Sequence, residues 1–353
     1  MSTSDLPEIQ IAGRPIGAAY SPYVICELSG NHNGSLDRAL MMIDAAAATG
    51  CDAIKIQTYT ADTITMDVDR PEFKIHGGLW DGRSLYELYQ EAQTPFEWHA
   101  ALFARAAERG VTLFSSPFDE TAVDLLDSLG APAFKIASFE AIDLPLIAYA
   151  ASKGKPLIIS TGMANLDEML AAREKALTAG AAGVVMLHCV SSYPAALEDA
   201  NVRTVADMTN RFDSPIGLSD HTHGTAASVA AIALGACVIE KHFTLARSDG
   251  GPDAAFSLEP AEFSALVRDC KEAWTALGHV NYDLLGSERA NIQFRRSLYV
   301  SADVRAGQVI GRGNIRSIRP GNGLPPAELE RILGRTASRD LRRGEPLTWD
   351  MLR

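Results

Sequence analysis

The sequence predicts a TIM barrel followed by a small β-rich domain, and three observations support this. Short runs of β-forming residues alternate with Ala-rich helical runs eight times between residues 19 and 277. Eight such units in about 260 residues is the size of a (β/α)8 barrel. Each predicted strand also ends in a polar side chain, at the end where barrel active sites are assembled. A doubly wound open sheet is the alternative, and the count of eight favours the barrel.

The predicted strands are short runs of apolar and β-branched residues bounded by turns. They lie at residues 23–27, 53–57, 111–115, 133–136, 156–160, 183–189, 216–218 and 237–239. Helical patterns cover residues 37–49, 144–152, 226–234 and 260–277. A further helix ends at residue 109, and two others begin at residues 119 and 165.

The pattern changes after the last of these helices. We expect a catalytic barrel at residues 1–277, a linker at 278–293 and a β-rich domain at 294–353. Short strands are expected at 296–300, 304–310 and 315–321. About sixty residues is near the lower size limit for independent stability. Because this domain is rich in arginine, it could act as a lid that offers an arginine to an anionic substrate.

The composition of the 353-residue chain restricts its partners and location. A net charge of −12 disfavours nucleic acid and anionic membranes as general partners. No apolar run is long enough for a membrane span, and the polar, acidic start of the chain does not resemble a secretory signal. The five cysteines show no CxxC spacing, which indicates reduced thiols and a cytoplasmic protein.

Two histidines stand at equivalent strand ends. His221 and His242 follow the last two predicted strands, and parallel strands joined by a helix open on the same face. Either histidine alone could be an ordinary loop residue. Together, with carboxylates nearby, they predict a site for a divalent transition metal with open coordination positions. His223 is expected to be structural.

Two lysines lie inside apolar strands. Lys55 lies in the run Ala-Ile-Lys-Ile, and Lys135 lies in the run Ala-Phe-Lys-Ile. A buried ammonium is costly unless it is paired. The two lysines therefore imply an anion between them, either a protein carboxylate or a substrate phosphate, and Glu27 is the predicted protein partner.

Several stretches resemble the sialic acid synthase family, which condenses phosphoenolpyruvate with an aminosugar aldehyde to make nonulosonic acids. They are CELSGNHNG at 26–34, KIQ at 55–57, SSPFD at 115–119, FKIAS at 134–138, STGM at 160–163, HC at 188–189, SDHT at 219–222, EKHFT at 240–244 and GPD at 251–253. IRPGNG at 318–323 resembles the antifreeze-like (SAF) domain of that family. The resemblance spans nearly the whole chain.

The resemblance implies roles for matching residues. His221 and His242 would be metal ligands, usually for Mn²⁺, and Glu27 would act at the reacting carbon. The residues expected to hold phosphoenolpyruvate are Lys55, Lys135, Ser138, Ser160 and Ser219, with Ser116 also at a strand end. The residues expected near the sugar are Gln57, Ser191, Tyr193, Asp253 and Arg319. In the family this arginine comes from the other chain of a domain-swapped homodimer.

The expected chemistry is a metal-assisted attack of phosphoenolpyruvate on the aldehyde. The metal polarises the aldehyde oxygen, water adds at the enol carbon, and phosphate leaves by C–O cleavage. Glu27 would stabilise the positive charge or steer the water. A metal-dependent aldolase or isomerase is one alternative, although paired lysines disfavour a Schiff base. A carbohydrate-binding protein without chemistry is another.

Residues 79–86, 191–194 and 255–260 are similar to the pseudaminic acid synthase branch. That branch uses a diacetamido 6-deoxy sugar, 2,4-diacetamido-2,4,6-trideoxy-altrose. The ring of Phe256 would suit its methyl group. Ser191 stands where Asn is frequent in sialic acid synthases, and His223 where an apolar residue is common. N-acetylneuraminate and legionaminate synthases therefore stay as alternatives.

Overall fold

The computed structural model describes residues 7–353, and the chain divides into two compact units. The first unit ends at Gly278, and the second is His279–Arg353. Among residues 7–353, none of the helices combines the length and apolar character needed to cross a membrane.

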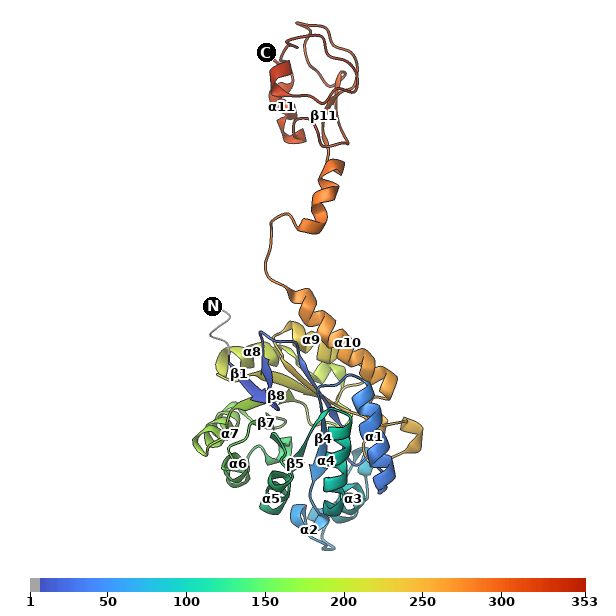
Figure 1. The fold of residues 1–353 in the computed structure, drawn as a ribbon, viewed down its shortest axis with the longest axis vertical. Helices are drawn as coiled ribbons and strands as arrows, with labels where there is room; N and C mark the ends of the chain where they lie inside the picture. Colours follow the sequence, from blue (N-terminus) through green and yellow to red (C-terminus); the bar gives the residue numbers. More distant parts are fainter. Residues whose placement is uncertain (1–6) are drawn as a thin grey trace. The chain divides into compact units, whose positions relative to one another are not determined.

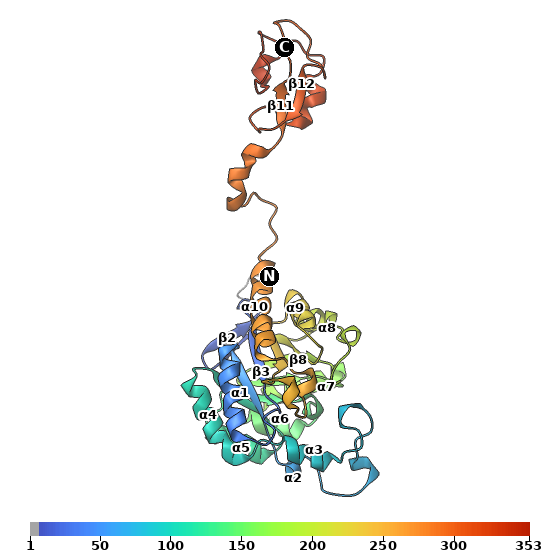
Figure 2. The ribbon, with the colours of Figure 1, turned by 90° about the vertical axis from the view of Figure 1, so that its right-hand side faces the viewer.

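The first unit is built on a closed barrel of parallel strands (Figures 1 and 2). The strands are β3 (Tyr23–Glu27), β4 (Ala53–Thr58), β5 (Thr112–Pro117), β6 (Phe134–Ile136), β7 (Leu157–Ser160), β8 (Val184–Cys189), β9 (Ile216–Asp220) and β10 (Val238–His242). The barrel closes because β10 pairs with β3, with Val238 opposite Tyr23 and His242 opposite Glu27. This confirms the predicted TIM barrel and excludes the open sheet.

Helices surround the barrel in both views (Figures 1 and 2). They are α1 (Leu36–Ala48), α2 (Ala61–Ile64), α3 (Leu85–Ala92), α4 (His99–Glu108), α5 (Glu120–Ser128), α6 (Leu144–Ala151), α7 (Leu166–Thr178), α8 (Arg203–Arg211), α9 (Ala226–Ala233) and α10 (Pro260–Leu277). Side chains of Ser35, Asp119 and Asn165 accept hydrogen bonds from the first backbone amides of α1, α5 and α7. These caps explain why the helices begin where they do.

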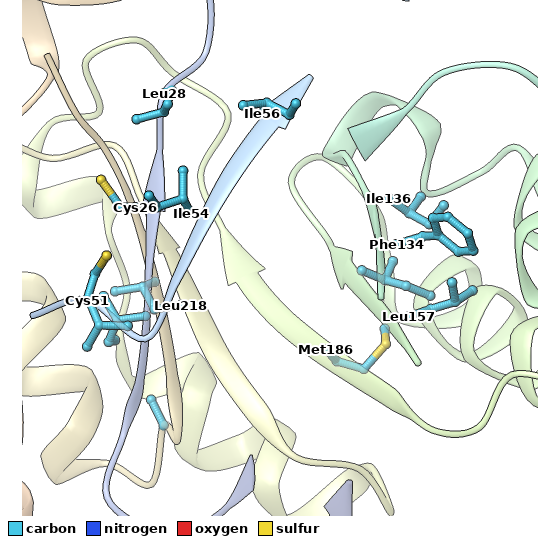
Figure 3. Packing of buried hydrophobic residues seen from close by; sticks show 14 of the residues in the cluster. Cys26, Leu28, Cys51, Ile54, Ile56, Phe134, Ile136, Leu157, Met186 and Leu218 are labelled. Carbon is cyan, nitrogen blue, oxygen red and sulfur yellow. The ribbon is translucent and has the colours of Figure 1, made fainter. Parts of the chain in front are cut away.

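The strands bury two different faces because side chains alternate along them. Val24, Cys26 and Ile54 belong to the larger core between barrel and helices, part of which is shown in Figure 3. Ile25 and Ala53, their neighbours, belong to a second core inside the barrel. Residues in step with Ile25 and Ala53 therefore point into the barrel.

The sequence did not predict the hairpin that precedes the barrel. β1 (Glu8–Ile11) and β2 (Arg14–Gly17) pair antiparallel. Their residues Ile9, Ile11 and Ile16 are buried in the same cluster as Tyr23 and Phe114, at the amino ends of the strands. The hairpin thus completes the apolar interior of the barrel.

The second unit is a small β-rich fold. β11 (Ser297–Val300) and β12 (Ile315–Ile318) pair antiparallel, and α11 (Leu329–Ile332) follows. Residues 304–310 do not form the predicted strand; only isolated bridges occur there, from Val304 to Leu341 and from Val309 to Thr336. The predicted linker contains a 3-10 helix, Gly286–Phe294. Leu298, Ile310 and Leu347 lie in the core of the unit.

Candidate active site

The carboxyl-terminal half of the barrel interior is polar. Glu27 and Lys55 face inward because they continue the pattern of Ile25 and Ala53. Lys55 Nζ lies 2.8 Å from Glu27 Oε2 and 3.3 Å from Ser116 Oγ. The Gln57 amide donates to Glu27 Oε1 at 2.8 Å. The predicted pairing of Glu27 with Lys55 is confirmed.

The carboxylate shared by both lysines is Glu240, which the candidate residues from the sequence did not include. Its Oε1 lies 3.4 Å from Lys55 Nζ and 3.7 Å from Lys135 Nζ, and it accepts a hydrogen bond from Ser219 at 3.4 Å. Lys135 Nζ also donates to Ser160 Oγ at 2.6 Å. The sequence could have placed Glu240 inside the barrel, because it precedes His242 by two positions and therefore lies on the same face of the strand.

Burial and pairing shift the pKa values of these groups in opposite directions. Burial raises the pKa of the Glu27 carboxyl, although Lys55 opposes the shift. Glu240 is equally buried, but Lys135 and Lys55 together hold its pKa below the usual value. Burial lowers the pKa of the Lys135 ammonium. Glu240 is therefore the firmly ionised carboxylate of this layer, and Glu27 is the one able to take up a proton.

The two predicted metal-binding histidines lie side by side at the rim, one layer above Ser219 and Glu240. Their ring centroids are 5.3 Å apart. β9 continues to Asp220 and β10 to His242, two and three residues beyond the predicted ends, because the added polar side chains find partners inside the barrel or behind it. The Tyr193 ring lies 4.5 Å from that of His221, and the Phe256 ring 4.9 Å from that of His242. The histidines thus have an aromatic wall on one side.

The histidine pair suits a metal with open positions. His221 Nδ1 donates to the Val190 carbonyl at 2.9 Å, which leaves Nε2 free as a ligand. Burial, followed by the neighbouring positive charges, lowers the pKa of His242 well below its usual value and keeps the ring neutral. The buried His242 Nδ1 has no hydrogen-bond partner within residues 7–353. Among those residues no group of three or more His, Cys, Asp or Glu side chains is placed to hold a metal, and His221 and His242 stay the predicted ligands.

Asp253, which is predicted to contact the sugar, lies beside His242. Its Oδ2 is 3.5 Å from His242 Nδ1 and accepts a hydrogen bond from the Ser29 hydroxyl. Burial raises the pKa of Asp253 to about 6. Asp253 and Phe256 share the loop after β10, whereas Tyr193 comes from the loop after β8, so this side of the rim is assembled from distant parts of the sequence.

Two further predicted serines converge on Gly162. The Ser138 hydroxyl accepts a hydrogen bond from the Gly162 amide at 3.2 Å. A Cβ at Gly162 would collide with the hydroxyls of both Ser138 and Ser191, so only glycine leaves room for them. Arg319 lies in the second unit, exposed and directly after β12. Its approach to the barrel stays a prediction.

A buried ion pair, which the sequence analysis did not predict, lies behind the histidines. Asp220 and Lys241 precede the two histidines and therefore face the helices. Lys241 Nζ is 2.8 Å from Asp220 Oδ2, and both side chains are only 1% exposed. Ser228 of α9 and Thr222 donate hydrogen bonds to the same carboxylate. The pair ties together the strand ends that carry the histidines.

Comparisons with known proteins identify the family to which the chain belongs. The NeuB family profile matches residues 42–282, and the SAF domain profile matches residues 295–353. A pseudaminic acid synthase from Campylobacter jejuni is 44% identical over 92% of this chain and 95% of its own length. The chain belongs to the NeuB family. This confirms the family that the sequence motifs predict.

Other NeuB-type proteins are more distant. An N,N'-diacetyllegionaminic acid synthase from Legionella pneumophila is 36% identical over 96% of both chains. The crystal structure of an N-acetylneuraminic acid (sialic acid) synthetase from Leptospira borgpetersenii, in complex with citrate, superposes with a TM-score of 0.73 at 31% identity. It covers 82% of this chain and 96% of that one. The structural similarity to this synthetase therefore covers more of the chain than the barrel strands alone.

Proposed function

We propose that this chain is a pseudaminic acid synthase. It condenses phosphoenolpyruvate with 2,4-diacetamido-2,4,6-trideoxy-altrose and releases phosphate. The observation that carries the proposal is the stacking of two layers in one barrel. Two buried lysines with hydroxyl partners lie beneath two imidazoles whose ring centroids are 5.3 Å apart. The higher identity to a pseudaminic acid synthase than to a legionaminic acid synthase, 44% against 36%, supports the choice of sugar.

The lower layer binds the anionic substrate. Lys55 and Lys135 are each oriented by a serine hydroxyl, and Ser219 and Glu240 complete the layer. Phosphoenolpyruvate carries a phosphate and a carboxylate, and two ammonium groups with converging hydroxyls suit both. Ser138 and Ser191 extend the hydroxyl surface toward Gly162.

The upper layer binds the metal and the sugar. His221 and His242 would hold Mn²⁺, which supplies Lewis-acid polarisation of the aldehyde oxygen when bound. Asp253 and Gln57 offer hydrogen bonds to the sugar. Phe256, 4.9 Å from the His242 ring, gives an apolar surface that suits the methyl group of a 6-deoxy sugar.

Glu27 lies where the two layers meet. His242 is opposite Glu27 in the pairing of β10 with β3, and Lys55 is opposite it on β4. When the methylene carbon of phosphoenolpyruvate forms a bond to the aldehyde carbon, positive charge develops at the neighbouring enol carbon. The Glu27 carboxylate would stabilise this charge and accept a proton from the water that adds there, before the C–O bond to phosphate breaks. Its raised pKa suits a proton acceptor.

We also propose that the enzyme works as a domain-swapped homodimer in which Arg319 from one copy reaches the barrel of the other. Arg319 is exposed and follows a strand of the small domain. A guanidinium at the rim would neutralise an anionic substrate. Removal of the second unit, residues 279–353, should leave a barrel that retains Mn²⁺ but loses turnover. The truncated protein should also be a monomer when its mass is measured by light scattering.

The test of the proposed function is direct. The purified protein is incubated with phosphoenolpyruvate, Mn²⁺ and each of three sugars, and phosphate and product mass are measured. The sugars are the diacetamido-trideoxy-altrose, N-acetylmannosamine and the legionaminate precursor. Phosphate release with the altrose compound alone supports the proposal. Release with a different sugar keeps the mechanism but overturns the specificity. No release with any sugar, although metal is bound, favours the aldolase or isomerase.

A further inference from the structure

Two rim loops that are far apart in sequence are joined by one asparagine. The first rim loop is residues 29–34, after β3, and the last rim loop is residues 250–257, after β10. Asn31 is fully buried, and its Nδ2 donates to the Phe243 carbonyl at 2.9 Å and to Ser257 Oγ at 2.9 Å. Its Oδ1 accepts from the Asp253 amide at 3.3 Å. Both polar atoms of the Asn31 side chain thus form hydrogen bonds to the last rim loop or to Phe243, the residue that follows β10.

The backbone around Asn31 is held in a strained conformation. Ser29 and Asn33, on either side, have φ of 50° and 52°, in the left-handed region that non-glycine residues rarely adopt. Such conformations persist only where the surroundings fix them, and they concentrate at functional sites. The left-handed backbone at Ser29 accompanies the hydrogen bond from its hydroxyl to Asp253.

Close packing on both sides fixes the first rim loop. A Cβ on Gly251 would lie 2.6 Å from Asn33 Oδ1 and 3.1 Å from Asn31 Oδ1. On the opposite side a Cβ on Gly30 would lie 2.9 Å from the Cβ of Ala92, at the end of α3. The two loops therefore have no space to slide past one another, and Asn31 occupies their contact.

The last rim loop carries the residues that face the histidines. Asp253 Oδ2 is 3.5 Å from His242 Nδ1, and the Phe256 ring is 4.9 Å from the His242 ring. Among the described residues, Asn31 makes no hydrogen bond to either histidine. It binds the backbone of Asp253 and the side chain of Ser257, and Ser257 Oγ in turn donates to the Asp253 carbonyl at 2.7 Å.

We propose that Asn31 is a positioning residue for sugar recognition, acting through Asp253 and Phe256. This rests on the proposed function, because it assigns the last rim loop to the sugar. The lysines lie on β4 and β6, and no hydrogen bond joins them to Asn31 within residues 7–353, so binding of phosphoenolpyruvate should not depend on it. Asn31 thereby serves one of the two substrates.

The experiment compares steady-state constants for each substrate in Asn31→Ala and in a matched control. Asn33→Gly is the control, since it removes exposed hydrogen bonds to the same loop and tolerates the positive φ. For Asn31→Ala we expect the KM for the sugar to rise about tenfold or more, as for the loss of buried hydrogen bonds. The KM for phosphoenolpyruvate should stay unchanged, and Asn33→Gly should resemble the parent.

A double variant separates positioning from general support of the fold. Asp253→Ala should raise the KM for the sugar by itself, and adding Asn31→Ala to it should add little, because the two residues act as one unit. If both KM values rise together, or if only the melting temperature falls, Asn31 merely supports the fold and the proposal is wrong. Fully additive effects would also overturn it.

Ser257→Ala provides a milder second test if Asn31→Ala does not fold. It removes a single hydroxyl from the same contact, so the KM for the sugar should again rise selectively; an unchanged value overturns the proposal. A parent enzyme that consumes no sugar at all would instead refute the proposed function, and the role of Asn31 with it. That result is distinct from an active parent with an unaffected Asn31→Ala variant.

Discussion

Replacing Glu240 with glutamine should destabilise the barrel mainly through Lys135. Glu240 Oε1 lies 3.4 Å from Lys55 Nζ and 3.7 Å from Lys135 Nζ. After the substitution Lys55 keeps Glu27 at 2.8 Å. Lys135 is 1% exposed, and Glu240 is its one carboxylate partner within 4.0 Å in the part of the chain that the structure describes. The variant therefore leaves a buried ammonium without a counter-charge.

The size of the effect follows from this geometry. Breaking a buried ion pair on one side costs about 3–5 kcal/mol. Lys135 can instead lose its proton on folding, and with an unfolded pKa of about 10.4 this costs about 4.6 kcal/mol at pH 7. In a unit of this size about 1 kcal/mol shifts the melting temperature by about 2 °C. We expect Glu240→Gln to melt about 6–10 °C below the parent at pH 7.

The loss should shrink as the pH rises. The folded variant holds Lys135 neutral with a depressed pKa, whereas the unfolded chain keeps it charged up to a pKa of about 10.4. The unfolded state therefore binds more protons, and the stability of the variant rises with pH through this window. At pH 9 the deprotonation costs only about 1.9 kcal/mol, so the gap narrows to about 4 °C.

Thermal unfolding of the metal-free protein by circular dichroism at pH 7 and pH 9 measures this gap. Glu27→Gln is the matched control, because Lys55 then retains Glu240 and the loss should be smaller. Lys135→Met combined with Glu240→Gln removes both charges and should restore most of the stability. An equal loss at both pH values, or a double variant as unstable as the single one, would refute the reasoning.

Three further predictions concern activity. Glu27→Gln should lower turnover by about 10²–10⁴-fold while changing KM far less, and near-normal turnover would remove Glu27 from the mechanism. His242→Ala should weaken Mn²⁺ binding by about 100-fold or more in calorimetry, since even outer-shell changes have effects of up to this size; unchanged affinity would place the metal elsewhere. Phe256→Tyr should reduce the preference in kcat/KM for the 6-deoxy sugar over its 6-hydroxy counterpart by about tenfold. An unchanged ratio would locate the methyl pocket away from Phe256.

The barrel could be predicted because eight strand–helix alternations leave few other topologies. The strand ends were harder, since apolar periodicity stops at Leu218 and Ile239 while the strands continue to Asp220 and His242. Polar residues at these positions stay in the strands because they find charged or hydroxyl partners across the barrel or behind it. Hydropathy along the sequence does not record those partners.

The sequence analysis named the candidate site residue by residue, but it did not predict the network that joins those residues. Motifs pointed to Lys55 and Lys135, yet the carboxylate that joins them, Glu240, depends on which side chains meet across the barrel. The contact of Asn31 with Asp253 links residues 222 positions apart, which no local pattern reveals. The β1–β2 hairpin was missed because four-residue strands carry too little periodicity to stand out.

The β1–β2 hairpin closes one end of the barrel. Ile9 and Ile16 pack with Tyr23 and the other apolar residues that fill the amino-terminal half of the interior, so nothing passes through the barrel from below. Substrates and products are therefore expected to enter and leave at the carboxyl-terminal rim. A substrate held at Lys135, as proposed, should therefore bind before the sugar at the rim. We therefore expect the anionic substrate to bind first, because the β1–β2 hairpin closes the opposite end of the barrel.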